Sequence, residues 1–233
     1  MNMRLVFLSG AAALLVAVTS VDAAAIFVTP AQYDATLILP APPPPSTADG
    51  KAELAELKRY QAARTPERLA RAKHDNDTTN ASIFAEVIGP GFDLAKLPAT
   101  AKALDDVRND EKTAADAAKA FFKRDRPWIV DDSMQSCHRN EGPQSSYPSG
   151  HSTMGYSLGV ILAHMVPEKA RAILARSREY AESRMVCGMH FRSDIVGGQT
   201  LGTLVAMEML QNPAFKAEFD AAVQELRAAK LAQ

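Results

Sequence analysis

The chain has 233 residues, a formal net charge of −1 and 47% hydrophobic residues. This length and composition suit one globular domain with a sizeable core. The near-zero net charge gives no sign of a nucleic-acid partner or of attraction to an anionic membrane surface.

The beginning of the chain differs in kind from the rest. A short basic start precedes an almost wholly apolar run over residues 5–18, and small residues follow it. This pattern is typical of a secretory signal peptide, which we assign to residues 1–23 with cleavage after Ala23 or Ala25. A membrane anchor is the weaker alternative, because the apolar run is shorter than the roughly 20 residues that a bilayer requires. We expect a mature protein that is periplasmic or secreted and is not stably inserted in a membrane.

A proline-rich stretch follows the leader and ends in LPAPPPPSTADG. Four consecutive prolines form neither a helix nor a central strand. We therefore expect residues 24–50 to form an extended arm over the surface, and residues 51–233 to form the domain itself.

From Lys51 onward the chain predicts helix after helix. In the stretch that runs to Pro127, five apolar residues recur at helical spacing and mark a buried face. These residues are Leu104, Val107, Ala115, Ala118 and Phe122. Residues 128–147 have the composition of a loop, and a loop of this length inside a domain usually carries function. No alternating strand pattern and no internal repeat is present, so the sequence predicts an all-α, single-domain helical bundle.

The chain has two cysteines, Cys137 and Cys187. In an oxidising compartment they can form a disulfide, but the sequence does not place their sulfurs within bonding distance. A bond would stabilise the fold by about 4 kcal/mol on the chain-entropy model. Two separate buried thiols are the alternative.

Three short blocks carry residue types that suit an anion, and the first is Lys119 followed after six residues by Arg126 and Pro127. Seven positions are almost two helical turns, so Lys119 and Arg126 are expected on one edge of a helix that Pro127 ends. Lys123 and Arg124 lie between them, and we expect both to be a solvated basic helix end.

The second block is PSGH, which comes directly before a predicted helix. Ser149 can cap that helix, and Gly150 lets the backbone approach a ligand closely. The exposed amides of a helix N-terminus attract anions, and His151 is placed where its side chain can face one.

The third block contains Arg184. If residues 167–185 form a helix, its inward stripe includes Leu174 and Arg184, and a guanidinium turned toward a core needs a partner. Arg178 falls on the same stripe, so periodicity does not choose between the two arginines.

The same block continues with His190 and Asp194. Asp194 shares a face with Gly198 and Leu201 of the next predicted helix, which makes it an inward carboxylate near the start of that helix. It needs a partner too, and His190, four residues earlier, is the nearest candidate.

Together the blocks spell K-x6-RP, PSGH and SR-x5-H-x3-D, in that order. With these motifs the sequence resembles the PAP2, or type 2 phosphatidic acid phosphatase, superfamily, and within it the secreted bacterial class A nonspecific acid phosphatases. Eleven fixed residues agree without a departure. Tyr147 before the PSGH block, the proline-rich arm and the export signal extend the resemblance over most of the mature chain.

The resemblance implies a role for each motif residue. His190 would be the nucleophile that forms a phosphohistidine, with Asp194 holding its far nitrogen, and His151 would be the general acid and then the base. The phosphate would be bound by Lys119, Arg126, Ser149, Gly150 and Arg184. Three fixed cations can do the work of a metal pair, so we expect neither a catalytic metal nor a cofactor.

The implied substrates are small phosphomonoesters such as nucleotides, sugar phosphates and aryl phosphates, with broad specificity, some phosphotransfer to alcohols and an acidic pH optimum. Self-association into a homo-oligomer is a further expectation from the resemblance. Three other readings stay open: a vanadium-dependent haloperoxidase, a soluble lipid phosphate phosphatase and a non-catalytic phosphate-binding protein. The last would not need His151, His190 and Asp194 together.

Overall fold

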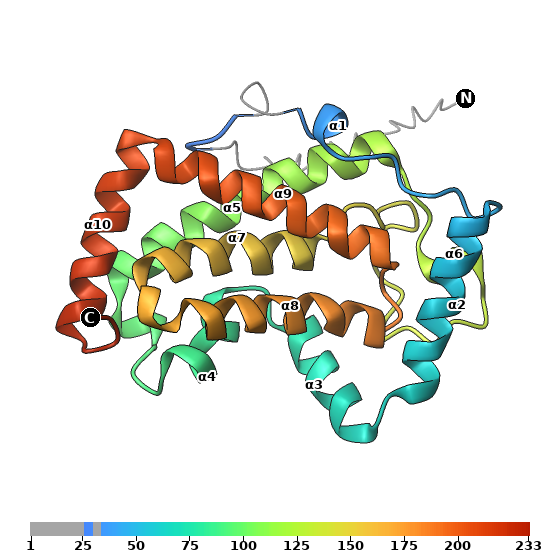
Figure 1. The fold of residues 1–233 in the computed structure, drawn as a ribbon, viewed down its shortest axis with the longest axis horizontal. Coiled ribbons are helices and arrows are strands. Elements are labelled where there is room, and N and C mark those ends of the chain that lie inside the picture. Colours follow the sequence, from blue (N-terminus) through green and yellow to red (C-terminus); the bar gives the residue numbers. More distant parts are fainter. Residues whose placement is uncertain (1–25, 30–33) are drawn as a thin grey trace, which may run out of the picture.

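The computed structural model describes residues 26–29 and 34–233, and within those ranges every regular element is a helix (Figure 1). The prediction of an all-α fold is confirmed. The helices are α1 (Ala35–Ile38), α2 (Ala48–Ala63), α3 (Pro66–Asp77), α4 (Ala85–Ile88), α5 (Pro98–Phe122), α6 (Pro127–Val130), α7 (Gly150–Met165), α8 (Ala170–Val186), α9 (Arg192–Gln211) and α10 (Pro213–Ala228), with short 3-10 turns η1 (Ala81–Phe84), η2 (Leu94–Lys96) and η3 (Pro167–Lys169). The signal peptide predicted for residues 1–23 lies outside the described residues. Of the helices in the described part, none is long and apolar enough to cross a membrane.

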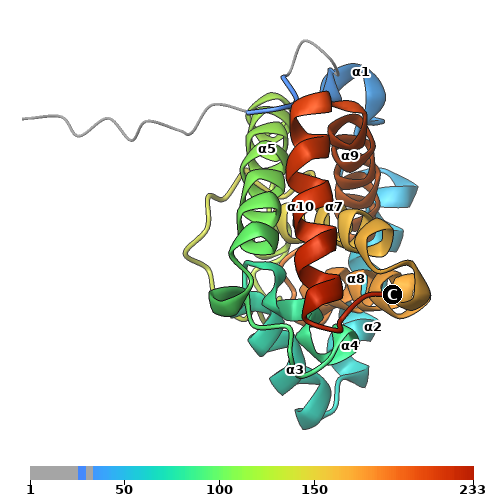
Figure 2. The same ribbon diagram turned by 90° about the vertical axis from the view of Figure 1, so that its left-hand side faces the viewer.

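Helix α7 lies at the centre of the bundle. Helices α8 and α9 run beside it, and α5 packs against both α7 and α9 (Figure 1). Helix α10 crosses one end of the bundle between α5 and α9 (Figure 2). The apolar stripe of α7 is fully buried in this arrangement, as its periodicity indicates. The stripe consists of Met154, Leu158, Ile161, Leu162 and Met165.

Helices α7 and α9 approach each other closely at their first turns. A Cβ atom at Gly198 would lie 2.6 Å from the carbonyl oxygen of Ser149, so only glycine fits there. The Ser149 amide donates a hydrogen bond to the Asp194 carbonyl oxygen at 3.0 Å. This contact fixes the PSGH block relative to the His190 and Asp194 block.

The helix expected to run to Pro127 ends earlier. Helix α5 stops at Phe122, because Lys123 adopts the left-handed conformation with φ of 46°. Arg126 lies beyond this break and is the N-cap of α6. The expectation that Lys119 and Arg126 share one edge of a single helix is therefore wrong.

The N-terminal arm is anchored to the domain. The buried carboxylate of Asp110 accepts hydrogen bonds from the amides of Ile26, Phe27 and Val28 at 2.6, 2.8 and 2.8 Å. The four prolines lie outside any helix, as predicted, but the short helix α1 falls within the stretch expected to be extended. Helix α2 begins at Ala48, slightly before the expected start of the domain.

The structure of α8 shows which of its two candidate arginines is buried. Arg184 is fully buried, whereas Arg178 and Leu174 are exposed. The expectation that Leu174 points inward is wrong, because α8 packs mainly against α7 and α3 and the face that it turns toward α3 is polar. On that face, the Arg176 guanidinium pairs with the buried carboxylate of Asp75.

Candidate active site

The three sequence blocks meet at a cavity of about 170 Å³. Four of the predicted residues line it: Lys119, Gly150, His151 and His190. Arg126 and Arg184 connect to its wall through hydrogen bonds to other lining residues. A larger hollow of about 440 Å³ beside α2 is lined by none of the predicted residues.

The hydrogen bonds of His190 define which of its ring nitrogens carries the proton. Nδ1 lies 2.8 Å from the Ser146 carbonyl oxygen, which can only accept, so Nδ1 is protonated. Nε2 lies 2.9 Å from a guanidinium nitrogen of Arg126, which can only donate, so Nε2 offers its lone pair. Burial, reinforced by the charges of Arg126 and Arg184, lowers the pKa of His190 well below its usual value. The ring is therefore uncharged, and Nε2, the nitrogen with the lone pair, is on the side of Arg126.

Asp194 supports this arrangement mainly through Ser146. Its carboxylate accepts from the Ser146 hydroxyl at 2.6 Å and from the Phe191 amide at 2.8 Å, whereas His190 Nδ1 is 3.4 Å away. The Ser146 carbonyl is thus the closer partner of His190, and the Ser146 side chain is held by Asp194. Sequence reasoning missed Ser146, because it lies in a loop and acts through its backbone.

Arg124 belongs to the same buried network, so the expectation that it is solvated is wrong. Its guanidinium donates to Asp194 at 2.6 Å and to Glu53 of α2 at 2.8 Å. It also stacks over the Phe191 ring, 4.4 Å from the ring centroid. The neighbouring Lys123 is exposed, as expected. Arg124 is buried because α2 and the start of α9 both pack against the break after α5.

Arg126 and Arg184 share one carboxylate, that of Glu141. Arg184 donates to Glu141 Oε1 at 3.0 Å, and Arg126 donates to Oε2. Both arginines are fully buried, whereas the Glu141 side chain is 28% exposed. Burial raises the pKa of Glu141, but Arg126 and Arg184 outweigh it and hold the pKa below its usual value. No periodic pattern marked Glu141 in the sequence, because it lies in the long loop before α7.

His151 is held from the opposite side by α3. Its Nε2 donates to the Asn76 carbonyl oxygen at 3.0 Å, and its ring stacks on Tyr180 with centroids 5.7 Å apart. The side chain of Asn76 also accepts a hydrogen bond from Arg184. Burial, followed by the charge of Arg184, lowers the pKa of His151 well below its usual value. With Nε2 committed to Asn76, Nδ1 is the nitrogen available to a ligand.

Ser149 and Gly150 place the start of α7 against Lys119. The Ser149 hydroxyl caps the helix by accepting from the Ser152 amide at 3.3 Å. A Cβ at Gly150 would lie 3.0 Å from Lys119 Nζ, so the glycine lets the ammonium reach the helix terminus. Burial and the charge of Arg126 lower the pKa of Lys119. Ser149 itself is buried and does not line the cavity.

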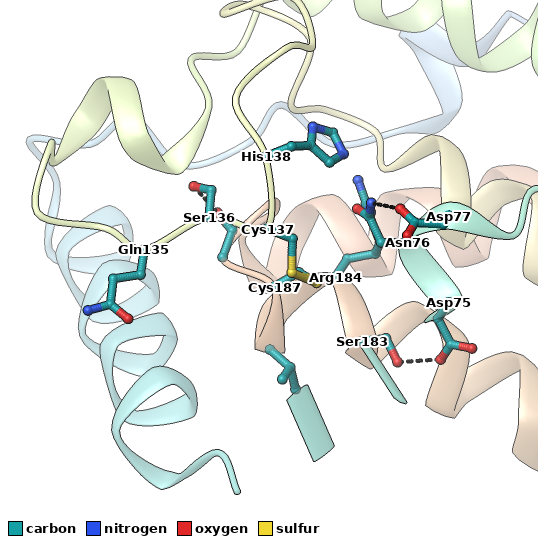
Figure 3. The surroundings of a disulfide bond; sticks show 12 residues. Asp75, Asn76, Asp77, Gln135, Ser136, Cys137, His138, Ser183, Arg184 and Cys187 are labelled. Atoms are coloured by element: carbon teal, nitrogen blue, oxygen red, sulfur yellow. Dashed lines mark hydrogen bonds between the residues drawn. A yellow bond between two sulfur atoms is a disulfide. The ribbon is translucent and has the colours of Figure 1, made fainter. Parts of the chain in front are cut away.

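A disulfide joins Cys137 of the long loop to Cys187, the residue that follows α8. It lies beside Arg184, as Figure 3 shows. The Cys137 amide also donates to the Cys187 carbonyl oxygen at 2.9 Å. The cross-link, which the sequence left open, ties the loop that carries Glu141 to the end of the helix that carries Arg184.

The site can hold a tetrahedral anion and attack it. Three cationic side chains face one partly exposed carboxylate, and an uncharged histidine offers a lone pair among them. Within the described ranges, no group of three or more His, Cys, Asp or Glu side chains is placed to hold a metal ion. That the reaction needs no metal stays a prediction. Over the described residues, fold and geometry define an all-helical protein with a candidate anion site that contains a histidine.

Comparison with known proteins gives a family match for part of the chain. Residues 112–217 match the model described as the PAP2 superfamily, and this part of the chain is a PAP2 superfamily domain. The matched stretch contains all three sequence blocks.

Several characterised proteins are similar to the chain. It is 32% identical to an "Acid phosphatase" of Zymomonas mobilis over 70% of its own length and 64% of that protein's length. It is 29% identical to a "Non-specific acid phosphatase" of Salmonella typhimurium over 79% of its length and 78% of that protein's. A relative of the same description from Providencia stuartii is 26% identical over 82% and 80% of the two lengths. These descriptions are consistent with the class A nonspecific acid phosphatases.

Several solved chains match this one, and one of them illustrates the similar fold. It is a transmembrane PAP2-type phosphatidylglycerolphosphate phosphatase from Bacillus subtilis, with a TM-score of 0.52 and 19% identity over 70% of this chain and 85% of that one. At this identity the likeness concerns the fold alone, and it agrees with the all-α PAP2 architecture.

Proposed function

We propose that this chain is an exported acid phosphatase that hydrolyses small phosphomonoesters through a phosphohistidine on His190. The PAP2 domain and the acid phosphatase relatives support a phosphoric monoester hydrolase. The observation that carries the mechanism is the uncharged His190 ring, whose Nε2 lone pair lies among buried cations.

In the first half of the reaction, Nε2 of His190 attacks the phosphorus atom. The P–N bond forms, the bond from phosphorus to the leaving oxygen breaks, and protonated His151 gives its proton to that oxygen. Positive charge on the phosphorylated His190 ring is shared with the Nδ1–H group, which donates to the Ser146 carbonyl. Lys119, Arg126 and Arg184 stabilise the charge on the three equatorial oxygens, and the Ser149 hydroxyl and Gly150 amide add hydrogen bonds.

In the second half, water attacks the phosphorus atom of the phosphohistidine. His151, now neutral, accepts a proton from that water, the P–N bond breaks, and phosphate leaves. An alcohol in place of water gives a new phosphomonoester, so phosphotransfer is expected. Burial keeps His151 neutral in the free protein, so the charge of the bound phosphate dianion must raise its pKa before it can act as an acid.

Substrate binding requires Glu141 to withdraw. Its carboxylate accepts a hydrogen bond from one terminal nitrogen, Nη2, of both Arg126 and Arg184, which are the side chains that the phosphate would use. Because the Glu141 side chain is 28% exposed, it can exchange these partners for water at modest cost. A phosphate dianion carries twice the charge of the carboxylate, so it competes effectively for the two guanidinium groups.

The finer parts of the proposal rest on the motifs and on the relatives. Broad specificity for nucleotides, sugar phosphates and aryl phosphates agrees with relatives described as non-specific. A periplasmic or secreted location is supported by the leader-like residues 1–23 and by the disulfide. Self-association into a homo-oligomer is part of the same proposal.

The test is hydrolysis of p-nitrophenyl phosphate from pH 4 to 8 in EDTA by the mature protein and by His190→Ala. We expect metal-independent turnover, highest at acidic pH, that falls by roughly 10⁴-fold or more in the variant. His164→Ala is the matched control, because His164 is an exposed histidine at the far end of α7. It should keep full activity.

A second measurement addresses the intermediate. Brief mixing with ³²P-labelled substrate followed by alkaline quench should trap label on the wild-type protein and not on His190→Ala. Absence of turnover in a folded wild-type protein that still binds phosphate would contradict the phosphatase assignment and favour the binding protein. Peroxidase activity that appears only with vanadate would favour the haloperoxidase.

A further inference from the structure

The active-site cavity extends beyond the phosphate-binding residues along α5. Besides Lys119, its walls include Arg108, Glu111, Lys112 and Asp116 of that helix. Glu111 and Lys119 are eight positions apart, a rise of about 12 Å. An ester whose phosphate is held at Lys119 and His190 therefore places its leaving group, and not its phosphate, beside Glu111.

Glu111 is a buried carboxyl group with one oxygen unused. Its side chain is 1% exposed, and Oε1 accepts a hydrogen bond from Arg108. Among the described residues, Oε2 has no hydrogen-bond partner. Leaving a buried polar atom unpaired is costly, so such an atom at the wall of a cavity indicates a partner that arrives with the ligand.

Each cation at this end of the cavity has its own carboxyl partner. Arg108 pairs with Glu111, and Lys112 pairs with Asp116 at 2.5 Å. The phosphate end, in contrast, has three cations and the single carboxylate of Glu141. A polar wall whose cations already have carboxyl partners suits an uncharged hydroxylated group better than a second phosphate or a purely aromatic ring.

We propose that Glu111 is a specificity-determining residue whose Oε2 binds a hydroxyl group of the leaving alcohol, so that the cavity favours phosphate esters of polyols over aryl phosphates. This inference rests on the proposed phosphatase function. Burial, opposed by the charge of Arg108, raises the pKa of Glu111 to about 7. Below that pH the uncharged carboxyl group both donates and accepts, as a hydroxyl partner requires.

The experiment compares kcat/KM for glucose 6-phosphate and for p-nitrophenyl phosphate in the full mature protein at pH 5.5. We expect Glu111→Ala to lower kcat/KM about ten-fold for the sugar phosphate and less than about two-fold for the aryl phosphate, because only the sugar loses a hydrogen-bond partner. Glu111→Gln should keep most of the preference, since its amide also donates and accepts.

Asp105→Asn is the matched control, because Asp105 is an exposed carboxylate on the same helix. It should leave both substrates unchanged. If the ratio of the two kcat/KM values in Glu111→Ala is the same as in the wild-type protein, the proposal is overturned. Glu111→Leu provides the same comparison if the alanine variant does not fold. Failure of the underlying function looks different, since the wild-type protein would then hydrolyse neither substrate.

Discussion

The two sides of the His190 ring differ in how their charges are balanced. On the Nδ1 side, the buried Arg124 is flanked by Asp194 and Glu53, and every charged group has a fixed partner. On the Nε2 side, two fully buried arginines share the partly exposed carboxylate of Glu141. The balanced side is closed and structural, whereas the other side carries an excess of positive charge and one removable anion. The difference teaches that buried charges with fixed partners orient the histidine, and we expect the two arginines that share one removable carboxylate to be the groups that bind a ligand.

The largest effect should come from the Nε2 side. Arg126→Ala removes a forked donor to the phosphate and the hydrogen bond to His190, so we expect kcat/KM for p-nitrophenyl phosphate to fall by about 10³-fold. Arg126→Lys keeps the charge but not the fork and should lose less. Steady-state kinetics together with thermal unfolding checks this. If unfolding of the variant fully explains its loss of activity, the Nε2 side of the His190 ring is structural like the Nδ1 side.

Substitutions on the Nδ1 side of the His190 ring should lower the stability of the fold. Arg124→Ala leaves the buried Asp194 carboxylate without its cation, and we expect the free energy of unfolding to fall by about 3 kcal/mol. Urea denaturation measures it, with Lys123→Ala, its exposed neighbour, as the control that should change by less than about 0.5 kcal/mol. Equal effects of the two substitutions would show that the buried network is not structural.

The free protein should become less stable as pH falls, because His151 and His190 are buried in their neutral form. The folded-state pKa values of His190 and His151 are lowered, so both stay neutral in the fold and take up protons on unfolding. Stability is therefore present above about pH 6.5 and is lost as pH falls below it, by up to about 1.4 kcal/mol per pH unit for each histidine. Melting temperatures from pH 7.5 to 5.5 test this. Saturating phosphate should flatten the dependence, because a bound anion raises both pKa values; an unchanged slope would contradict an anion site beside these rings.

The smallest expected effect is tighter binding of inorganic phosphate in a variant of Glu141. Glu141→Gln removes the negative charge that competes for Arg126 and Arg184, so inorganic phosphate should inhibit about three-fold to ten-fold more strongly. Asp132→Asn, an exposed carboxylate in the same loop, is the control. Weaker inhibition in Glu141→Gln would mean that the carboxylate helps to hold the ligand instead of competing with it.

The sequence by itself predicted the helical fold and selected the residues of the candidate site. Apolar residues at helical spacing predicted the buried face of α7, and each of the three motif blocks supplied at least one residue that lines the same cavity. These signals are local, because a helical stripe and a short motif are both complete within a few turns of chain. No contact between distant segments is needed to detect them.

Only the tertiary structure decided which polar groups pair. Arg124 and Arg126 are two residues apart, yet one contacts Asp194 and the other contacts the lone-pair nitrogen of His190. Helical periodicity did not separate Arg184 from Arg178, and no sequence signal marked Ser146. The partners of these buried groups lie far along the chain and come into contact with them only when the helices pack. Charge pairing in a buried site depends on that packing, since burial makes each unpaired group costly and each partner specific.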